Sequence, residues 1–440
     1  MTVSVVTQSS DSITLQINIK FGRSMLDTEH LIQDELNNAG TITTEALLKT
    51  FDTDGSPIRF GDVKMTSMGL VSKHYQTPYG EATIDRYVYQ TSKGGTTFCP
   101  LEKEARIIIA STPRFASQIS YKMAEMPAIA VVNDLSKNHN RNIAQNVVQR
   151  VSDAVSAIIQ IKEESWEYQI PNIANKEIKT VGIGLDGTCM LMSEGSYRQA
   201  MVGTIALYDN KGERQHTTYV SASPEYGKEK FIQRLTREIE RAKSLYPEAI
   251  YIGVADGAHD NWTFLKTHTT KQTVDFYHVT EYLAKAASVI FKDENQREKW
   301  LDETCHELKH TPSAAINILR QLEDLKARSP QRKQKNIEGD DQTSKQPKNA
   351  LDAAITYFTN NTKESRMNYA EAQAANEPIG SGITEAACKT IVKQRLCKSG
   401  MRWKDKGAAA ILSLRALMKS DGRWEQFWSK VNQYGFPIAA

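Results

Sequence analysis

The sequence predicts an α/β protein of several domains, in which strands and helices alternate through the middle of the chain. Between residues 178 and 291, short apolar runs alternate with amphipathic helical patterns, as in an α/β sheet. The length of 440 residues exceeds one ordinary core and suggests about three units at roughly 150 residues each.

The composition is that of a soluble globular chain, with 40% hydrophobic and 24% charged residues. No run approaches the roughly 20 apolar residues of a membrane span. The N-terminal stretch lacks the basic and apolar segments of a secretory signal. The five cysteines are scattered without a CxxC pair, so neither a zinc ribbon nor a disulfide scaffold is indicated. We therefore expect a cytoplasmic protein with no membrane partner.

The N-terminal region, residues 1–111, is predicted to contain both helix and strand. A helical pattern covers 27–48, and alternation between Met65 and Cys99 predicts a β-hairpin or small sheet. Residues 112–172 predict helices. Two of these, over 128–135 and 141–159, flank the polar turn 136–140.

This pair of helices has the outline of a helix-turn-helix, with Arg141 as a candidate DNA contact at the start of the second helix. Any helical hairpin has the same outline, so a plain helical pair is the alternative.

Residues 173–292 predict a sheet with interspersed helices. The expected elements are strands over 178–185, 199–208 and 215–222, a helix over 226–245, a strand over 249–255, a helix through Trp262 and Phe264, a strand over 274–277 and a helix over 281–291. Three strands, a helix, a strand, a helix and a strand is the order of a ribonuclease H-like α/β fold.

A helical block is expected to interrupt this core. Residues 293–377 have apolar residues at helical spacing, and the polar stretch 326–349 within them predicts a mobile loop. Residues 378–440 are expected to complete the core, beginning with a glycine-rich approach and a long basic helix from about Thr384.

Positive charge is concentrated near the C-terminus. Residues 386–440 contain 11 Lys/Arg against 3 Asp/Glu, whereas residues 1–165 contain 16 against 18. This distribution suits a protein that binds a polyanion through one side of its surface. The candidate DNA contacts are Lys389, Lys393, Arg395, Lys398, Arg402 and Trp403, the last by stacking on an unpaired base. A solvated basic face, with Trp403 as a core residue that covers the helix end, is the alternative.

Three carboxylates are candidate ligands for divalent metal. Asp186 and Asp256 each end an apolar strand and precede a glycine, and ligands of α/β sheets usually bind at that edge. Glu385 lies in the first turn of the basic helix. Each has a structural alternative, because Asp-Gly is a common turn and a first-turn Glu favours the helix dipole and can pair with Lys389.

The acidic residues lie in runs that resemble a known family. The run 378–389, PIGSGITEAACK, continues to Trp403 and resembles the C-terminal signature of DDE transposases of the ISKra type, bacterial insertion-sequence enzymes related to the Mutator-like group. The runs 184–188 and 254–258 resemble the first and second acidic motifs, and Asp275 to His278 resembles a D/C-x-x-H motif. The paired cysteines that relatives often carry near the hairpin are missing, so we claim no zinc.

The resemblance implies a ribonuclease H-like catalytic domain with an all-helical insertion. It implies Asp186, Asp256 and Glu385 as the catalytic triad, binding Mg²⁺ or alternatively Mn²⁺. His278 is expected near the scissile phosphate or hydrogen-bonded to a ligand carboxylate, or it only fixes the strand–helix junction.

The expected activity is metal-dependent cleavage of transposon ends, followed by strand transfer from the freed 3′-hydroxyl. The partners would be double-stranded DNA, both terminal inverted repeats and target, and a second copy of the chain in a homodimer, at the nucleoid when bound. The rivals are a structure-selective two-metal nuclease and a non-enzymatic DNA-binding protein derived from a transposase.

Overall fold

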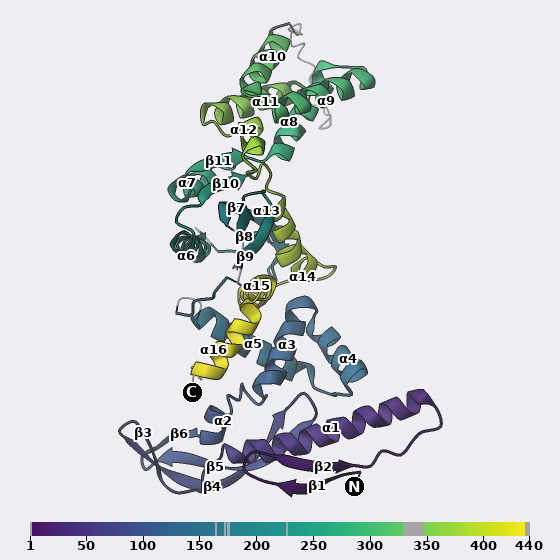
Figure 1. Ribbon diagram of the computed structural model, residues 1–440, viewed down its shortest axis with the longest axis vertical. Helices are drawn as coiled ribbons and strands as arrows, with labels where there is room; N and C mark the ends of the chain where they lie inside the picture. Colours follow the sequence, from purple (N-terminus) through teal and green to yellow (C-terminus); the bar gives the residue numbers. More distant parts are fainter. Residues whose placement is uncertain are drawn as a thin grey trace. The chain divides into compact units, whose positions relative to one another are not determined.

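The computed structural model describes residues 2–162, 165–170, 173, 177–225, 228–328 and 347–435 (Figure 1). The chain forms two compact units, and its mixed α/β character is as predicted. Unit 1 comprises residues 1–169, 404–418 and 422–440, and unit 2 comprises 170–403 and 419–421. The segment 378–440, expected to complete one domain, therefore contributes to both units.

Unit 1 begins with two antiparallel sheets and one long helix. The strands β1 (Val3–Gln8) and β2 (Ile13–Ile17) form a two-stranded sheet. A second sheet has the order β3-β4-β5-β6, comprising Ile58–Phe60, Val63–Gln76, Glu81–Thr91 and Gly94–Phe98. It contains the sheet predicted between Met65 and Cys99. The helix α1 (Met25–Thr50) packs against β5, with Leu48 buried in a core that includes Tyr75 and Ile84.

The helices of unit 1 come from both ends of the chain: α2 (Pro100–Glu104), α3 (Pro113–Glu125), α4 (Ala128–His139), α5 (Gln145–Lys162), α15 (Asp405–Lys419) and α16 (Arg423–Tyr434). Aromatic side chains connect them: Trp424 of α16 meets Tyr121 of α3 at 5.3 Å between ring centroids. The turn predicted at 136–140 is wrong in position. The helix α4 continues to His139 and ends where Asn140 adopts a left-handed conformation.

Unit 2 is built on a five-stranded sheet with the order β11-β10-β7-β8-β9. Its strands are β7 (Ile178–Leu191), β8 (Tyr197–Asp209), β9 (Arg214–Ala222), β10 (Ile250–Ala255) and β11 (Lys271–Val274). β7, β8 and β9 form an antiparallel meander, whereas β10 pairs in parallel with both β7 and β11. The strand predicted at 274–277 lies instead at 271–274, because Asp275 caps a helix that begins at Phe276.

Helices cover both faces of this sheet (Figure 1). The helices α6 (Glu229–Leu245) and α7 (His259–His268) pack on one face, where Leu235 approaches Gly203 and Leu265 approaches Gly253. The other face carries α13 (Gly382–Ala387) and η2 (Cys388–Lys393), a π-helix that continues into α14 (Gln394–Leu396). The basic helix predicted from about Thr384 is therefore short and interrupted by a π turn.

The predicted helical block lies between the sheet and α13 in the chain, and in Figure 1 it gathers beyond β11. It follows α8 (Phe276–Ile290) and contains α9 (Glu294–His310), α10 (Ala314–Arg328), α11 (Pro347–Lys363) and α12 (Tyr369–Ala374). Of the loop predicted at 326–349, the two ends are helical, and residues 329–346 lie outside the described residues. No helix in the described part of the chain is long and apolar enough to cross a membrane.

Candidate acidic site at the ends of β7 and β10

Two of the predicted acidic residues lie at the same level on neighbouring parallel strands. Gly184 of β7 with Val254 of β10 is the last pair in the ladder between these strands. Asp186 and Asp256 each lie two residues beyond that pair. The strand end predicted at Asp186 is wrong, because β7 keeps pairing with β8 as far as Leu191, whereas β10 ends at Ala255 as predicted. Because neighbouring strands are about 4.8 Å apart, the matched register brings both aspartates to one edge of the sheet.

Both aspartates are half-buried and bind nearby backbone. One oxygen of Asp186 accepts a hydrogen bond from the amide of Gly187 at 2.6 Å, and one oxygen of Asp256 accepts from the amide of Ala258 at 3.3 Å. The Tyr357 hydroxyl of α11 donates to the backbone carbonyl of Asp256 at 2.7 Å. In the ranges that the structure describes, neither carboxylate forms an ion pair with a lysine or arginine.

A third aspartate follows the next strand, and its side chain has a structural role. Val274 of β11 pairs with Ala255 of β10, and Asp275 follows directly. Its side chain is fully buried, and its two oxygens accept hydrogen bonds from the backbone amides of His278, at 2.8 Å, and Ser381. Asp275 thus caps α8 and fixes the segment that enters α13.

The helix that carries Glu385, α13, approaches the sheet very closely at Gly184. A Cβ atom on Gly184 would lie 2.0 Å from Oγ1 of Thr384, so only glycine allows this approach. The Oγ1 atom of Thr384 lies 2.7 Å from that of Thr204 on β8, in a buried hydrogen bond. Glu385 follows Thr384 in the chain, and these contacts hold its helix over β7 and β8.

His278 and Glu385 lie beside each other. Nε2 of His278 is 3.6 Å from Oε1 of Glu385, and the same oxygen accepts a hydrogen bond from the Ser381 hydroxyl at 3.0 Å. Nδ1 of His278 lies 4.0 Å from Glu281. The side chains of His278 and Glu385 are 35% and 52% exposed, so both reach solvent. His278 thus contacts a predicted ligand carboxylate, the arrangement of a group that orients a ligand from outside.

Cys388 connects the helix of Glu385 to Asp186. Its Sγ atom lies 3.5 Å from Oδ2 of Asp186 and donates to it. Burial raises the pKa of the Cys388 thiol, and the nearby Asp186 carboxylate raises it further. The thiol therefore stays protonated and acts as a hydrogen-bond donor.

The donors suit a hard divalent cation, but they do not form a closed cage. Carboxylate oxygens are the ligands that Mg²⁺ prefers, and those of Asp186, Asp256 and Glu385 lack a lysine or arginine partner among the described residues. Within the same residues, no three His, Cys, Asp or Glu side chains are already grouped as metal ligands. Binding would require side-chain rotation, which the half-exposed Glu385 allows.

Four of the predicted DNA contacts are exposed. They are Lys389, Lys393, Lys398 and Arg402. The π turn over Cys388–Lys393 interrupts the helix that carries Lys389 and Lys393, and both residues are exposed there.

Two other predicted contacts are held inside unit 2. The side chain of Arg395 is buried, 2% exposed, with its guanidinium 5.3 Å from the centre of the Trp403 ring. The indole of Trp403 donates a hydrogen bond to the carbonyl of Leu396 at 2.8 Å. Arg395 is therefore not available to a phosphate, and Trp403 covers the helix end, as its structural alternative predicted.

Arg141 in unit 1 is buried as well. Its guanidinium donates to the carbonyl of Thr77 at 3.2 Å and to the side chain of Gln76 at 2.9 Å, and it lies over the ring of Phe115. The prediction that Arg141 binds DNA is not supported, because its polar atoms serve the packing of α3 against the end of β4.

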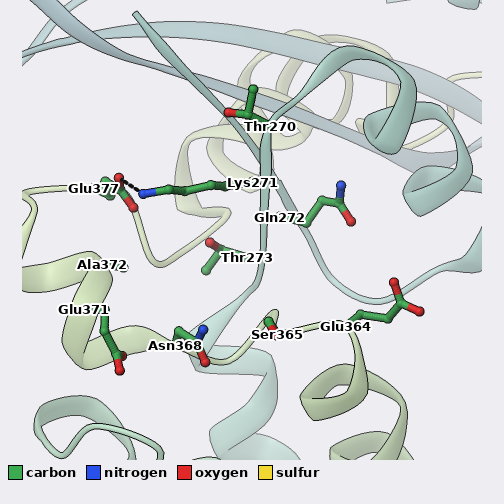
Figure 2. Close-up of a pocket in the computed structure, with 10 residues that line it drawn as sticks. All are labelled: Thr270, Lys271, Gln272, Thr273, Glu364, Ser365, Asn368, Glu371, Ala372 and Glu377. Carbon is green, nitrogen blue, oxygen red and sulfur yellow. Dashed lines mark hydrogen bonds and ion pairs between the residues drawn. The ribbon is translucent and has the colours of Figure 1, made fainter.

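A separate cavity of about 310 Å³ lies at the start of β11 (Figure 2). Residues 270–273 line one wall, and the other is lined by residues of the α11–α12 connection, of α12 and by Glu377 after it. Lys271 reaches across it to Glu377 in an ion pair. None of the predicted site residues lines this cavity.

Ser381, Thr384 and Cys388 contribute to the acidic site and were not predicted from the sequence. Cys388 lies three residues after Glu385, a spacing that places two side chains near each other on a helix, so this signal was present.

No protein-family model matches this chain, and no curated protein is significantly similar to it.

Proposed function

We propose that this protein is a DNA transposase that cleaves transposon ends and joins the freed 3′-hydroxyl to target DNA. The observation that carries the proposal is the matched register of Asp186 on β7 and Asp256 after β10, each two residues beyond the last pair of these parallel strands, with the helix of Glu385 packed across Gly184. Two carboxylates in matched register and a third from a distant helix suit two-metal phosphoryl transfer.

The order of the strands supports the same proposal. The sheet reads β9-β8-β7-β10-β11, with an antiparallel meander followed by two strands parallel to β7. This strand order supports the proposal of a ribonuclease H-like core. The helices α9 to α12 occupy the place of the expected insertion, between the second aspartate and Glu385 in the chain.

Asp186, Asp256 and Glu385 would hold Mg²⁺ or Mn²⁺. When bound, the metal would supply activation of the attacking oxygen and stabilisation of the leaving oxygen. Among the protein groups, His278 and Ser381 hold Glu385 through its Oε1 atom, and Cys388 orients Asp186. These contacts orient Asp186 and hold Glu385 beside His278, from where the Glu385 side chain would rotate to reach the metal.

The reaction proceeds in two displacements without a covalent protein–DNA intermediate. Water attacks the phosphorus at the transposon end, and the bond from phosphorus to the 3′-oxygen breaks, leaving a 3′-hydroxyl. That hydroxyl then attacks a target phosphate, and the target strand releases its own 3′-oxygen. The exposed Lys389, Lys393, Lys398 and Arg402 would bind DNA phosphates near Glu385. A homodimer would bring two transposon ends together.

The test is cleavage and joining with the DNA that flanks the gene for this chain. We expect Asp186→Asn, Asp256→Asn and Glu385→Gln each to lose Mg²⁺-dependent cleavage by a factor of about 10³ or more while retaining DNA binding. Asp260→Asn is the matched control, because Asp260 is an exposed aspartate in the first turn of α7. Full cleavage by Asp186→Asn would end the proposal.

Joining of a labelled 3′-hydroxyl end to a plasmid separates the transposase from its rivals. Cleavage without joining would point to a structure-selective nuclease. DNA binding without any metal-dependent cleavage would point to a non-enzymatic protein derived from a transposase.

A further inference from the structure

Two exposed cysteines of unit 2 lie in contact, one on the strand β7 and the other after α14. Cys189 is in β7, three residues after Asp186, and Cys397 directly follows α14. The Sγ atom of Cys397 is 3.7 Å from the backbone carbonyl oxygen of Cys189. The Cys397 thiol therefore contacts the main chain of Cys189. A disulfide would require the two side chains to turn toward each other with their Cα atoms about 4.4–6.8 Å apart.

The surrounding backbone holds this approach in place. The pairing of β7 with β10 ends at Gly184, so the later part of β7 has no strand on that side. The segment after Cys397 returns to β7 there: the amide of Trp403 donates to the carbonyl of Leu191 at 3.1 Å, and the amide of Ser193 donates to the carbonyl of Trp403 at 2.8 Å. Residues 397 to 403 are therefore anchored to the strand that carries Cys189.

We propose that Cys189 and Cys397 form a reversible disulfide when the protein meets a low-molecular-weight disulfide. The bond would join the strand that carries Asp186 to the helical segment that carries Glu385. The proposal concerns an oxidisable dithiol and is independent of the activity proposed above.

The reaction is two successive thiol–disulfide exchanges. The Cys189 thiolate attacks one sulfur of oxidised glutathione, forming a mixed disulfide and releasing one glutathione. The Cys397 thiolate then attacks the Cys189 sulfur and releases the second glutathione. The two protons of the protein thiols end on the two released glutathione thiols, so the protein is oxidised by two electrons and the glutathione disulfide is reduced.

The other three cysteines provide an internal comparison. Cys388 is buried, and Cys99 and Cys305 are only partly accessible. Burial raises the pKa of Cys305 to about 11, and it also raises the pKa of Cys99. These thiols should therefore react slowly at neutral pH. Burial also raises the pKa of Cys397, so closure of the bond should be faster in mildly alkaline solution.

The test is oxidation of the whole chain with oxidised glutathione, followed by thiol counting and peptide mapping without reductant. Of the five thiols, we expect two to disappear and a single peptide pair, joined through Cys189 and Cys397, to appear. Dithiothreitol should restore all five. Cys189→Ser and Cys397→Ser should each lose the cross-link, whereas Cys305→Ser should keep it.

Two further measurements test whether the disulfide stabilises the fold. Oxidation should raise Tm by about 5 °C or more, since the bond closes a long loop of the unfolded chain. It should also slow amide hydrogen exchange across residues 382–397. Five free thiols after oxidation, glutathione left on Cys189 without a cross-link, or a cross-link through any other pair would overturn the proposal.

Discussion

The buried carboxylate of Asp275 accepts a hydrogen bond from the backbone amide of Ser381, which is 106 residues away in the chain. Its other oxygen accepts from the amide of His278. One side chain therefore fixes the start of α8, which carries His278, and the entry to α13, which carries Glu385. The relative position of His278 and Glu385 depends on this carboxylate, although Asp275 itself is too buried to meet a substrate.

Asp275→Asn should destabilise unit 2. An amide side chain offers one acceptor and one donor, so its NH₂ group would face one of the two backbone amides. We expect a loss of about 1–3 kcal/mol in the free energy of unfolding, measured with urea. Asp293→Asn is the matched control, because Asp293 is an exposed N-cap of α9 and asparagine caps equally well. Equal effects of the two substitutions would contradict this assignment.

Gly184→Ala should displace the helix of Glu385. The added methyl would lie 2.0 Å from Oγ1 of Thr384 and 3.1 Å from Oγ1 of Thr204, so α13 must move away from β7. We expect a loss of about 1–3 kcal/mol and, on the proposed function, a loss of cleavage. Gly382→Ala adds a methyl to the same helix in open space and should leave both quantities nearly unchanged. If Gly184→Ala changes stability and cleavage no more than Gly382→Ala does, the close approach of α13 to β7 is not needed for either property.

The sequence predicted one of the two strand ends at an Asp-Gly pair. β10 ends at Ala255, directly before Asp256, as the pattern indicated, because a buried strand must be apolar and its turn polar. β7 instead continues past the predicted end at Leu185 to Leu191, since its later residues still pair with β8, so Asp186 lies within the strand. The strand at 274–277 was misplaced, because Phe276 and Tyr277 extend an apolar run across a helix cap. Phe276 packs against Tyr369 of α12 at 5.2 Å between ring centroids, a contact that the local pattern cannot indicate.

The basic residues were harder to interpret from the sequence. Arg141 and Arg395 have the same charge as the exposed Lys398, and only tertiary contacts determine which side chains are buried. The π turn over Cys388–Lys393 has no signature in residue type, so the sequence predicted an uninterrupted helix there. The contact between Asp275 and Ser381 could likewise not be predicted from local sequence patterns, since it joins distant parts of the chain.

Lys398→Gln and Arg395→Gln should have opposite effects. The exposed Lys398 should contribute to DNA affinity, so its loss should reduce the slope of log K against log salt by about 0.9, with unchanged Tm. The buried Arg395 should contribute to stability, and its loss should cost about 1–3 kcal/mol with an unchanged salt slope. DNA binding by filter assay at several salt concentrations, together with urea unfolding, distinguishes the two roles. The reverse result would exchange the two assignments.

His278→Gln should weaken metal use more than folding. On the proposed function, loss of the imidazole beside Glu385 should lower the cleavage rate 10–100-fold at fixed Mg²⁺ and raise the Mg²⁺ concentration for half-maximal rate. A purely structural histidine would change Tm without changing the metal requirement. His310→Gln on α9 is the control, and we expect no change in either quantity. An unchanged metal requirement in His278→Gln would argue against its contact with a ligand carboxylate.

Glu102→Gln should make unit 1 less sensitive to acid. The Glu102 carboxylate accepts hydrogen bonds from Lys73 at 2.6 Å, Tyr75 at 2.7 Å and Arg86 at 3.3 Å. Burial alone would raise its pKa, but the hydrogen bonds from Lys73 and Tyr75 and the neighbouring positive charges outweigh burial and hold the pKa below its ordinary value of 4.5. A lowered folded-state pKa adds stability above the unfolded value, and that stability is lost as pH falls through the folded pKa.

We therefore expect Glu102→Gln to lose about 1–3 kcal/mol at neutral pH, where the carboxylate is charged in both folded and unfolded chains. Below pH 4.5 the wild-type carboxylate protonates in the unfolded chain first, so the difference between the two proteins should shrink. Urea unfolding of both proteins from neutral pH down to about pH 3 measures this difference. Glu104→Gln is the control, because this exposed neighbour accepts no comparable set of hydrogen bonds. A difference that stays constant through the acid range would show that the charge of Glu102 does not stabilise the fold.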